Sequence, residues 1–205
     1  MSDPVVYKFI DDVPKKQPEN REGLAAHLGG HENETHLDEG ALDFLIEKFS
    51  VKSMLDVGCG PAGMVKLATD KGLDVLGVDG DFNVIRPDDV KDRIVIHDFN
   101  TGPFVPPRQF DLAWCCEFVE HIDWYYMQNF ITAFQSCKYV AMTHALPGQP
   151  GHHHVNCQVA EYWIGAMNAM GFEILVDDTN TLRQKSTMKE RYIRQQGYLF
   201  KNGRI

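Results

Sequence analysis

Apolar positions along the chain follow two spacings, short continuous runs and longer stretches with helical periodicity. Short runs bounded by turn residues predict strands at residues 53–57, 73–78, 93–97, 110–115, 138–144, 172–176 and 197–201. Apolar residues spaced three and four apart predict helices at residues 38–49, 61–71, 124–136, 159–170 and 181–194. Only short loops separate the second, third and fourth strands, which leaves no room there for two full crossover helices. The alternation predicts an α/β fold, a doubly wound and mostly parallel sheet with helices on both faces.

The composition predicts one folded domain preceded by a loose N-terminal segment. The 205 residues, 43% of them apolar, suffice for a sizeable core. Residues 1–35 are polar and contain three prolines, so we expect an N-terminal arm or lid there and the folded domain at residues 36–205. No apolar run approaches the ~20 residues that cross a bilayer, and the start of the chain does not resemble a signal peptide. These short runs predict no membrane association. Five cysteines in apolar or strand-like surroundings predict a reduced, cytoplasmic location.

The charge is negative overall but unevenly spread. A net charge of −9 at pH 7 argues against duplex nucleic acid as a partner, because such binding needs a basic footprint. Residues 181–205 nevertheless contain seven Lys or Arg and one acid. This basic end is either a solvated face of an acidic body or a rim that attracts an anionic substrate.

Residues 53–63, SMLDVGCGPAG, predict a buried strand, a tight turn and the start of a helix. Gly58, Gly60 and Gly63 let the backbone turn sharply and approach a ligand closely. Asp79 ends the next predicted strand, where an acid accepts hydrogen bonds from ribose hydroxyls. NAD and S-adenosylmethionine (SAM) sites share this geometry, and a similar turn also occurs where it only packs a helix on a strand.

Asp56 favours SAM. A carboxylate at the end of a buried strand needs a cationic or N–H partner, and the ammonium of the SAM methionine moiety provides one. With this acid two residues before the glycine turn, the chain resembles the class I SAM-dependent methyltransferases. The resemblance implies a Rossmann-like, seven-stranded sheet whose last strand is antiparallel, and SAM as cofactor. It also implies adenine contacts from Asp98 and Phe99, which otherwise would be a turn residue and a core residue.

The fourth predicted strand runs into Glu117-Phe118-Val119-Glu120-His121, an E-x-x-E-H pattern. On a helical turn Glu117, Glu120 and His121 share one face. This set suits Mg²⁺ or another divalent cation such as Mn²⁺. It equally suits a general base with an orienting acid.

The pattern resembles two metal-dependent groups, the quinone-biosynthesis O-methyltransferases and the plant-type small-RNA 3′-terminal 2′-O-methyltransferases. In the latter a histidine beyond the fifth strand completes the metal site, and here that region contains His152, His153 and His154. We assign His154 to the metal set, although the sequence does not fix which of the three faces the site. In metal-free members of the superfamily the Glu-His pair caps a helix, orients loops or provides a base. His144, at the tip of the fifth strand, joins His121 and Glu117 as a catalytic candidate.

The resemblance implies direct in-line transfer of a methyl group, aided mainly by alignment of the reactants. An alcohol acceptor needs a base or a metal that lowers the hydroxyl pKa. The histidine-rich site and the acidic body therefore favour O-methylation of a hydroxylated small molecule or sugar over duplex nucleic acid. The alternatives are a metal-dependent RNA 2′-O-methyltransferase and a non-catalytic SAM-binding or partner protein. His27, His31 and His36 in the arm are either surface residues or part of a cofactor lid. Neither the acceptor's identity nor the oligomeric state follows from the sequence.

Overall fold

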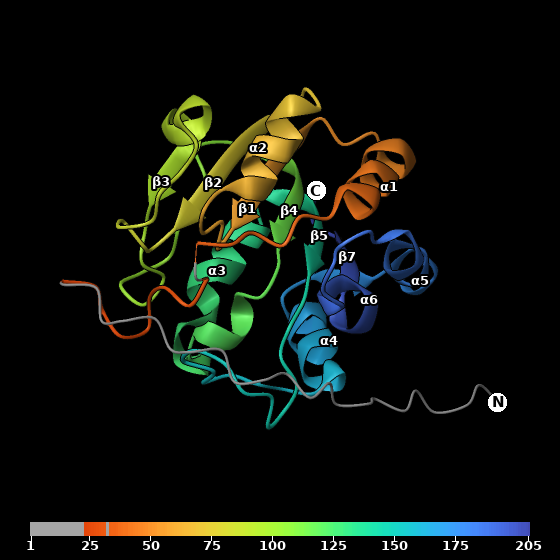
Figure 1. Ribbon diagram of the computed structural model, residues 1–205. Helices are drawn as coiled ribbons and strands as arrows, with labels where there is room; N and C mark the ends of the chain where they lie inside the picture. Colours follow the sequence, from red (N-terminus) through yellow and green to blue (C-terminus); the bar gives the residue numbers. More distant parts are fainter. Residues whose placement is uncertain (1–22, 32) are drawn as a thin grey trace.

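A seven-stranded sheet forms the centre of the structure, a computed structural model that describes residues 23–31 and 33–205. The strand order is β3-β2-β1-β4-β5-β7-β6 (Figure 1). β7 is antiparallel to both of its neighbours, and the pairs among β1 to β5 are parallel. This confirms the predicted sheet, while most of the predicted arm lies outside the described residues. The strands are β1 (Ser53–Val57), β2 (Asp74–Asp79), β3 (Ile94–Ile96), β4 (Phe110–Cys115), β5 (Cys137–Met142), β6 (Phe172–Ile174) and β7 (Tyr198–Asn202).

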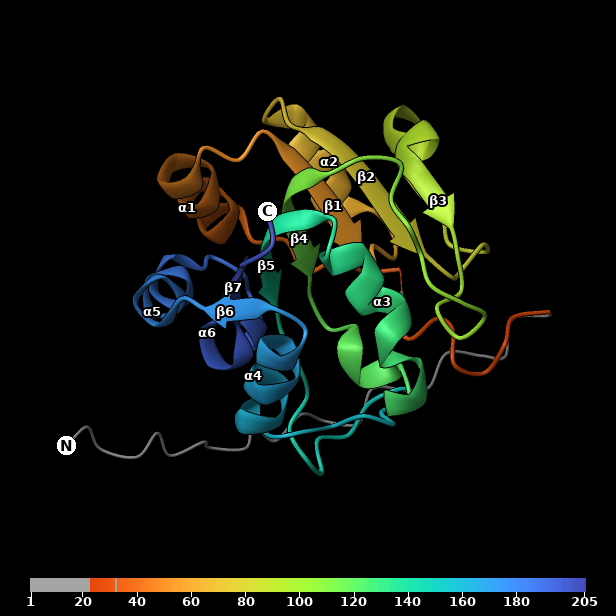
Figure 2. The same ribbon diagram turned by 180° about the vertical axis from the view of Figure 1, so that it is seen from behind.

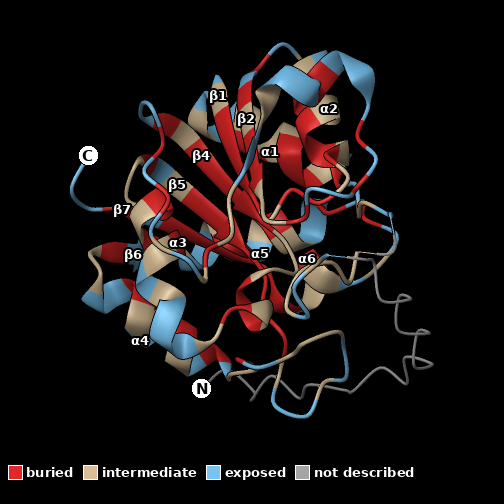
Figure 3. Ribbon diagram, turned by 90° about the vertical axis from the view of Figure 1, so that its left-hand side faces the viewer, coloured by how far each residue is buried: buried red, intermediate tan, exposed pale blue. Residues whose placement is uncertain are grey.

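Helices cover both faces of the sheet, and the strands between them are mostly buried (Figures 1, 2 and 3). One face packs against α1 (Glu39–Phe49), α2 (Gly63–Asp70), α5 (Val176–Lys185) and α6 (Tyr192–Gln196). The other packs against α3 (Met127–Phe134) and α4 (Ala160–Ala169). Successive side chains of a strand point to opposite faces of the sheet. Trp114 of β4 therefore packs on the face covered by α1, α2, α5 and α6, and Cys115 packs on the face covered by α3 and α4. The 3₁₀ helices are η1 (Asp88–Arg93), η2 (Val119–His121) and η3 (Trp124–Tyr126).

The strand order places a ligand site at one edge of the sheet. The chain runs outward from β1 through β2 to β3, and then returns to β4 on the other side of β1. Ligands of open α/β sheets bind outside the carboxyl ends of the strands at such a switch point. Of the predicted strand-end residues, Asp56, Asp79 and Glu117 lie together at this edge of the sheet.

α2 differs slightly from the predicted helix 61–71. It begins at Gly63 because Ala62 adopts a left-handed conformation with φ 66°. At its other end Gly72 has φ 85°, and the Leu73 N–H donates to Ala68 O, which is the geometry of a Schellman motif.

The predicted helix 181–194 is wrong, because the chain forms two helices with a break between them. The buried carboxylate of Asp38 holds the break in place. It caps α1 by accepting from the Ala41 N–H (3.0 Å), and it also accepts from the Ser186 hydroxyl and the Thr187 N–H (2.8 Å). Within the described part of the chain, no helix combines the length and apolar character needed to cross a bilayer.

Candidate active site

A cavity of about 420 Å³ opens at the carboxyl ends of β1 and β2 and beside the segment that follows β4. Its volume lies in the usual range for small-ligand sites. Two further segments complete the wall. We call residues 23–31 and 33–37 the arm, and residues 149–154 the histidine loop.

Asp56, near the end of β1, lines the cavity with an almost fully buried carboxyl group. Burial, and secondly the nearby charge of Asp79, raises the pKa of Asp56 from 3.8 to about 8. A ligand ammonium entering the cavity would stabilise the ionised form of this group. The geometry therefore fits the cationic end of a methionine moiety.

The glycine turn after β1 forms the adjacent wall. Gly58 and Gly60 line the cavity with positive φ angles of 77° and 47°. A Cβ on Gly58 would overlap the Phe118 ring, so this position requires glycine. Gly63 does not line the cavity. Its N–H donates to Thr35 Oγ1 (3.1 Å), so it joins the start of α2 to the arm.

Asp79, at the end of β2, lines the cavity and stabilises the glycine turn. Its Oδ2 accepts from the Gly60 N–H (2.9 Å), and its Oδ1 accepts from the Asp81 N–H (2.7 Å). Burial raises the pKa of Asp79, and these two hydrogen bonds oppose the rise. Arg86 Nη2 lies 3.6 Å from the same Oδ1. A carboxylate has about four acceptor positions, so Oδ2 keeps capacity that a ribose hydroxyl could use.

Asp98 and Phe99 follow β3 but do not line the cavity. The Asp98 Oδ2 lies 2.9 Å from the His27 Nε2 of the arm, and its Oδ1 accepts from the Asn100 N–H (2.9 Å). Phe99 is 2% exposed within the aromatic core. The adenine contacts implied for these two residues stay predictions, and the arm occupies Asp98 in this conformation.

The other arm histidines also face carboxylates. His31 Nε2 lies 2.9 Å from Asp81 Oδ2, and His36 Nδ1 lies 3.1 Å from Glu190 Oε2. Both histidines line the cavity, as His27 does. The arm is therefore part of the cavity wall, and its role as a cofactor lid stays a prediction.

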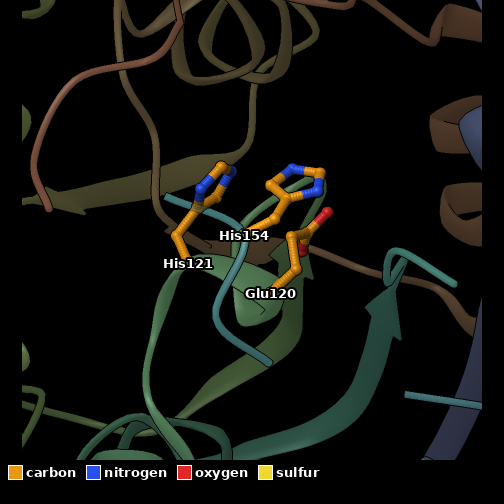
Figure 4. Close-up of side chains that lie close together, drawn as sticks. All are labelled: Glu120, His121 and His154. Atoms are coloured by element: carbon orange, nitrogen blue, oxygen red, sulfur yellow. The ribbon is translucent and has the colours of Figure 1, made fainter. Parts of the chain in front are cut away.

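Glu120, His121 and His154 lie close together beside the cavity (Figure 4). One potential ligand atom from each lies within 4.8 Å of the other two. Glu120 is 0% exposed, and no group in the described part of the chain donates a hydrogen bond to either carboxylate oxygen. Burial, with the charge of Glu117 second, raises the pKa of Glu120 well above 4.5. A buried carboxyl group without a partner is costly, and a bound cation would offset that cost.

Hydrogen bonds to backbone carbonyls orient both imidazoles. His121 Nδ1 lies 2.7 Å from His152 O, and His154 Nδ1 lies 3.0 Å from Gln149 O. Because a carbonyl only accepts, each Nδ1 carries the proton. Burial lowers the pKa of His121 to about 3 and also lowers that of His154, so both rings are neutral. Each Nε2 lone pair is then available to a ligand, the arrangement typical of metal-bound histidine.

The two residues that directly follow the histidine loop attach it to η2. Glu120 O accepts from the N–H groups of Val155 and Asn156, both at 3.0 Å. A Cβ on Gly151 would overlap the His154 ring at Nε2, so glycine at this position keeps that nitrogen accessible. Of the three adjacent histidines, His154 is the one that joins Glu120 and His121.

Glu117 lines the cavity but lies outside this group of three, contrary to the expected shared face. The helical turn begins only at Val119, and Glu117 has a left-handed φ of 52°. Thr143 holds it there: its Oγ1 accepts from the Glu117 N–H (2.8 Å) and donates to Glu117 Oε1 (2.9 Å).

His144 also differs from its expected position. It is 1% exposed and does not line the cavity. Its ring stacks on Tyr198 at 5.5 Å between centroids and lies 6.4 Å from the Trp163 ring. β5 ends at Met142, and the side chain then turns into the core beneath α4. We therefore leave His144 out of the proposed mechanism.

Sequence reasoning missed the groups that orient the site. Thr143 stands at the carboxyl end of a predicted strand, a position where site residues gather, and this signal could have identified it. The carbonyls of Gln149 and His152 leave no trace in the side-chain pattern.

Comparison with known proteins identifies the family. A family model described as a methyltransferase domain matches residues 30–176, most of the chain. The chain belongs to this methyltransferase family. It is a SAM-dependent methyltransferase, as the sequence predicted. A comparison with curated proteins found no match.

Solved structures with the same fold include several methyltransferases. The methyltransferase domain of bacterial CtHen1-C is 18% identical with a TM-score of 0.54, and the match covers 80% of this chain and 96% of that one. A SAM-dependent methyltransferase from Archaeoglobus fulgidus is 18% identical with a TM-score of 0.51, covering 78% and 91%. The Burkholderia thailandensis 1,6-didemethyltoxoflavin-N1-methyltransferase, solved with S-adenosylhomocysteine (SAH), is 14% identical with a TM-score of 0.54, covering 80% and 75%. At these identities the likeness shows the fold.

Proposed function

We propose that this methyltransferase methylates a hydroxyl oxygen of a small molecule or sugar beside a divalent cation held by Glu120, His121 and His154. One observation carries the proposal: a buried carboxyl group without a hydrogen-bond partner lies next to two neutral imidazoles with oriented lone pairs. A substrate hydroxyl near such a cation would have a lowered pKa and become a better nucleophile.

Residues on the β1 and β2 side would hold the cofactor. Asp56 would bind the ammonium of SAM, and Asp79 would bind its ribose hydroxyls. Gly58 and Gly60 line the cavity without side chains, so the glycine turn would let the methionine moiety approach the backbone there. When bound, SAM would supply a sulfonium methyl group; its transfer to the acceptor oxygen would break the C–S bond, release SAH and lose the hydroxyl proton to solvent. The chain's main contribution would be alignment of the two reactants.

The pKa of His121 favours a metal site over a general base. An effective base has a pKa near the working pH, whereas burial holds the pKa of His121 at about 3. Two imidazoles and one carboxylate form a set richer in nitrogen than Mg²⁺ prefers. Of the two cations expected from the sequence, we therefore propose Mn²⁺.

A chelation and add-back assay tests the proposal. Chelator-treated protein would be incubated with SAM and a panel of sugars, nucleosides and phenols, and SAH formation would be measured. We expect activity on a hydroxylated acceptor that EDTA abolishes and Mn²⁺ restores. Full activity in EDTA, or a methyl group found on nitrogen, would sink the proposal.

An RNA terminus is the second candidate acceptor. The cluster of Glu120, His121 and His154 supports it, because a terminal ribose offers the hydroxyls that a bound cation would engage. The net charge of −9 supports the smaller acceptor instead. An assay with two oligonucleotides, one ending in a 2′-hydroxyl and one in a 2′-deoxyribose, tests this candidate. An RNA 2′-O-methyltransferase would methylate only the oligonucleotide with the 2′-hydroxyl.

We also propose a cytoplasmic location. All five cysteines are free, which fits a reducing compartment.

A further inference from the structure

The arm and the histidine loop touch at His152. The His152 Nε2 lies 3.1 Å from Leu28 O, so the ring N–H donates to the arm backbone. Gly30, with φ 86°, lies against the same ring, and a Cβ there would come within 2.9 Å of His152 Cδ2. The imidazole of His152 therefore rests directly on the arm.

The backbone of His152 contacts the proposed metal site. Its carbonyl oxygen accepts the hydrogen bond from His121 Nδ1 at 2.7 Å. This bond sets the tautomer and the orientation of the His121 ring. One residue thus touches the arm through its side chain and a proposed metal ligand through its backbone.

The arm also contacts the cofactor end of the cavity. The Leu28 side chain packs on Gly80, directly after Asp79, so closely that a Cβ on Gly80 would lie 2.5 Å from Leu28 Cδ2. His31 bonds Asp81 on the same loop. A ligand that settles against Asp79 and Gly60 therefore adjoins the arm segment that holds His152.

We propose that His152 is a positioning residue that couples the cofactor site to the metal site. A bound S-adenosyl ligand stabilises the arm conformation that accepts the His152 hydrogen bond, and the held loop keeps its carbonyl on His121. Cofactor and metal then bind with positive cooperativity, and the coupling must be equal in both directions. The inference rests on the proposed function, because it needs a metal at Glu120, His121 and His154.

Calorimetry tests the coupling without any acceptor. Mn²⁺ would be titrated into the protein with and without saturating SAH, and SAH with and without saturating Mn²⁺. We expect each ligand to increase the protein's affinity for the other by the same factor, at least about fivefold. In His152→Ala the backbone carbonyl remains, so Mn²⁺ affinity without SAH should stay within about threefold of the wild type while the coupling factor falls toward one.

Two further variants guard against a purely structural effect. His152→Gln keeps a side-chain N–H donor and should recover part of the coupling. Val155→Ala changes an exposed side chain just after the loop, keeps the backbone N–H that donates to Glu120 O, and should leave the coupling unchanged.

The outcomes separate this inference from the proposed function. If wild-type protein binds both Mn²⁺ and SAH but neither affects the other, the coupling is wrong and the metal site stands. If His152→Ala keeps the full coupling factor, His152 is not the connection. If wild-type protein binds SAH but no Mn²⁺, both the proposed metal site and the coupling are overturned.

Discussion

Glu120 must lose its proton before it can bind a cation, because burial raises its pKa well above 4.5. His121, with a pKa of about 3, does not compete for protons near neutral pH. Mn²⁺ affinity should therefore rise with pH above about 4.5, by up to tenfold per pH unit, as measured by calorimetry. Glu120→Gln should bind weakly without this slope, whereas Glu117→Gln should keep it. A wild-type affinity that does not change with pH would contradict the assignment.

Asp56 gives a second proton-linked prediction. Its pKa of about 8 means that the carboxyl group is largely protonated at pH 6.5, whereas a bound ammonium requires the ionised form. SAH binding near about pH 6.5 should then release close to one proton, detected by calorimetry in buffers of different ionisation enthalpy. Asp56→Asn should abolish the release. Equal proton release in the variant would assign the proton to another group.

Individual residues were predictable where a strand end placed them. Asp56, Gly58, Gly60 and Asp79 line the cavity because each lies at or just beyond the carboxyl end of a strand that the apolar pattern located. Glu117 was misplaced because its left-handed φ depends on the contact with Thr143, which directly follows the neighbouring strand β5. A contact between distant parts of the chain leaves no local signal in the sequence.

Among the elements, α1 depends on Asp38 for its attachment to the segment between α5 and α6. Its carboxylate is buried and accepts from three groups on two segments. Asp38→Ala should lower the free energy of unfolding by about 2–4 kcal/mol, since it removes a helix cap and two further hydrogen bonds to a charged group.

Urea denaturation would measure this loss. Asp43→Ala serves as the matched control: Asp43 belongs to α1 but forms a surface ion pair with Lys71 at 2.7 Å. Exposed pairs of this kind contribute about 0–1 kcal/mol. An equal loss of unfolding free energy in the two variants would show that Asp38 stabilises the fold no more than an exposed acid does.

The apolar pattern located the strands well because their two buried faces require continuous apolar runs. It failed at the predicted helix 181–194, where composition alone favours one helix. The break follows from Asp38, far away in the sequence, and Arg194 stabilises it by donating to Met188 O and Glu190 O (2.8 Å). A helix break that depends on residues far away in the sequence cannot be predicted from the local sequence pattern.

For the whole molecule, the basic end is partly structural. Arg183 donates to Gly197 O (2.8 Å), and Arg194 bonds several carbonyls between α5 and α6. These guanidinium groups stabilise the fold, which favours the reading of this end as a face of the domain over a rim for anionic substrates. The cavity itself lies at the switch point of the sheet, as the fold predicts.

The central claim is that a cofactor half on β1 and β2 adjoins a cation cluster on η2 and the histidine loop. The most direct test of that claim is an electron paramagnetic resonance titration, which follows the loss of the free Mn²⁺ signal. Wild-type protein should bind a single Mn²⁺ per chain, and Glu120→Gln and His154→Ala should each lose at least about tenfold in affinity. His36→Gln, another cavity-lining residue, should bind as the wild type does. Variants at Glu120 and His154 that bind Mn²⁺ as tightly as the wild type, or a wild type that binds none, would contradict the account.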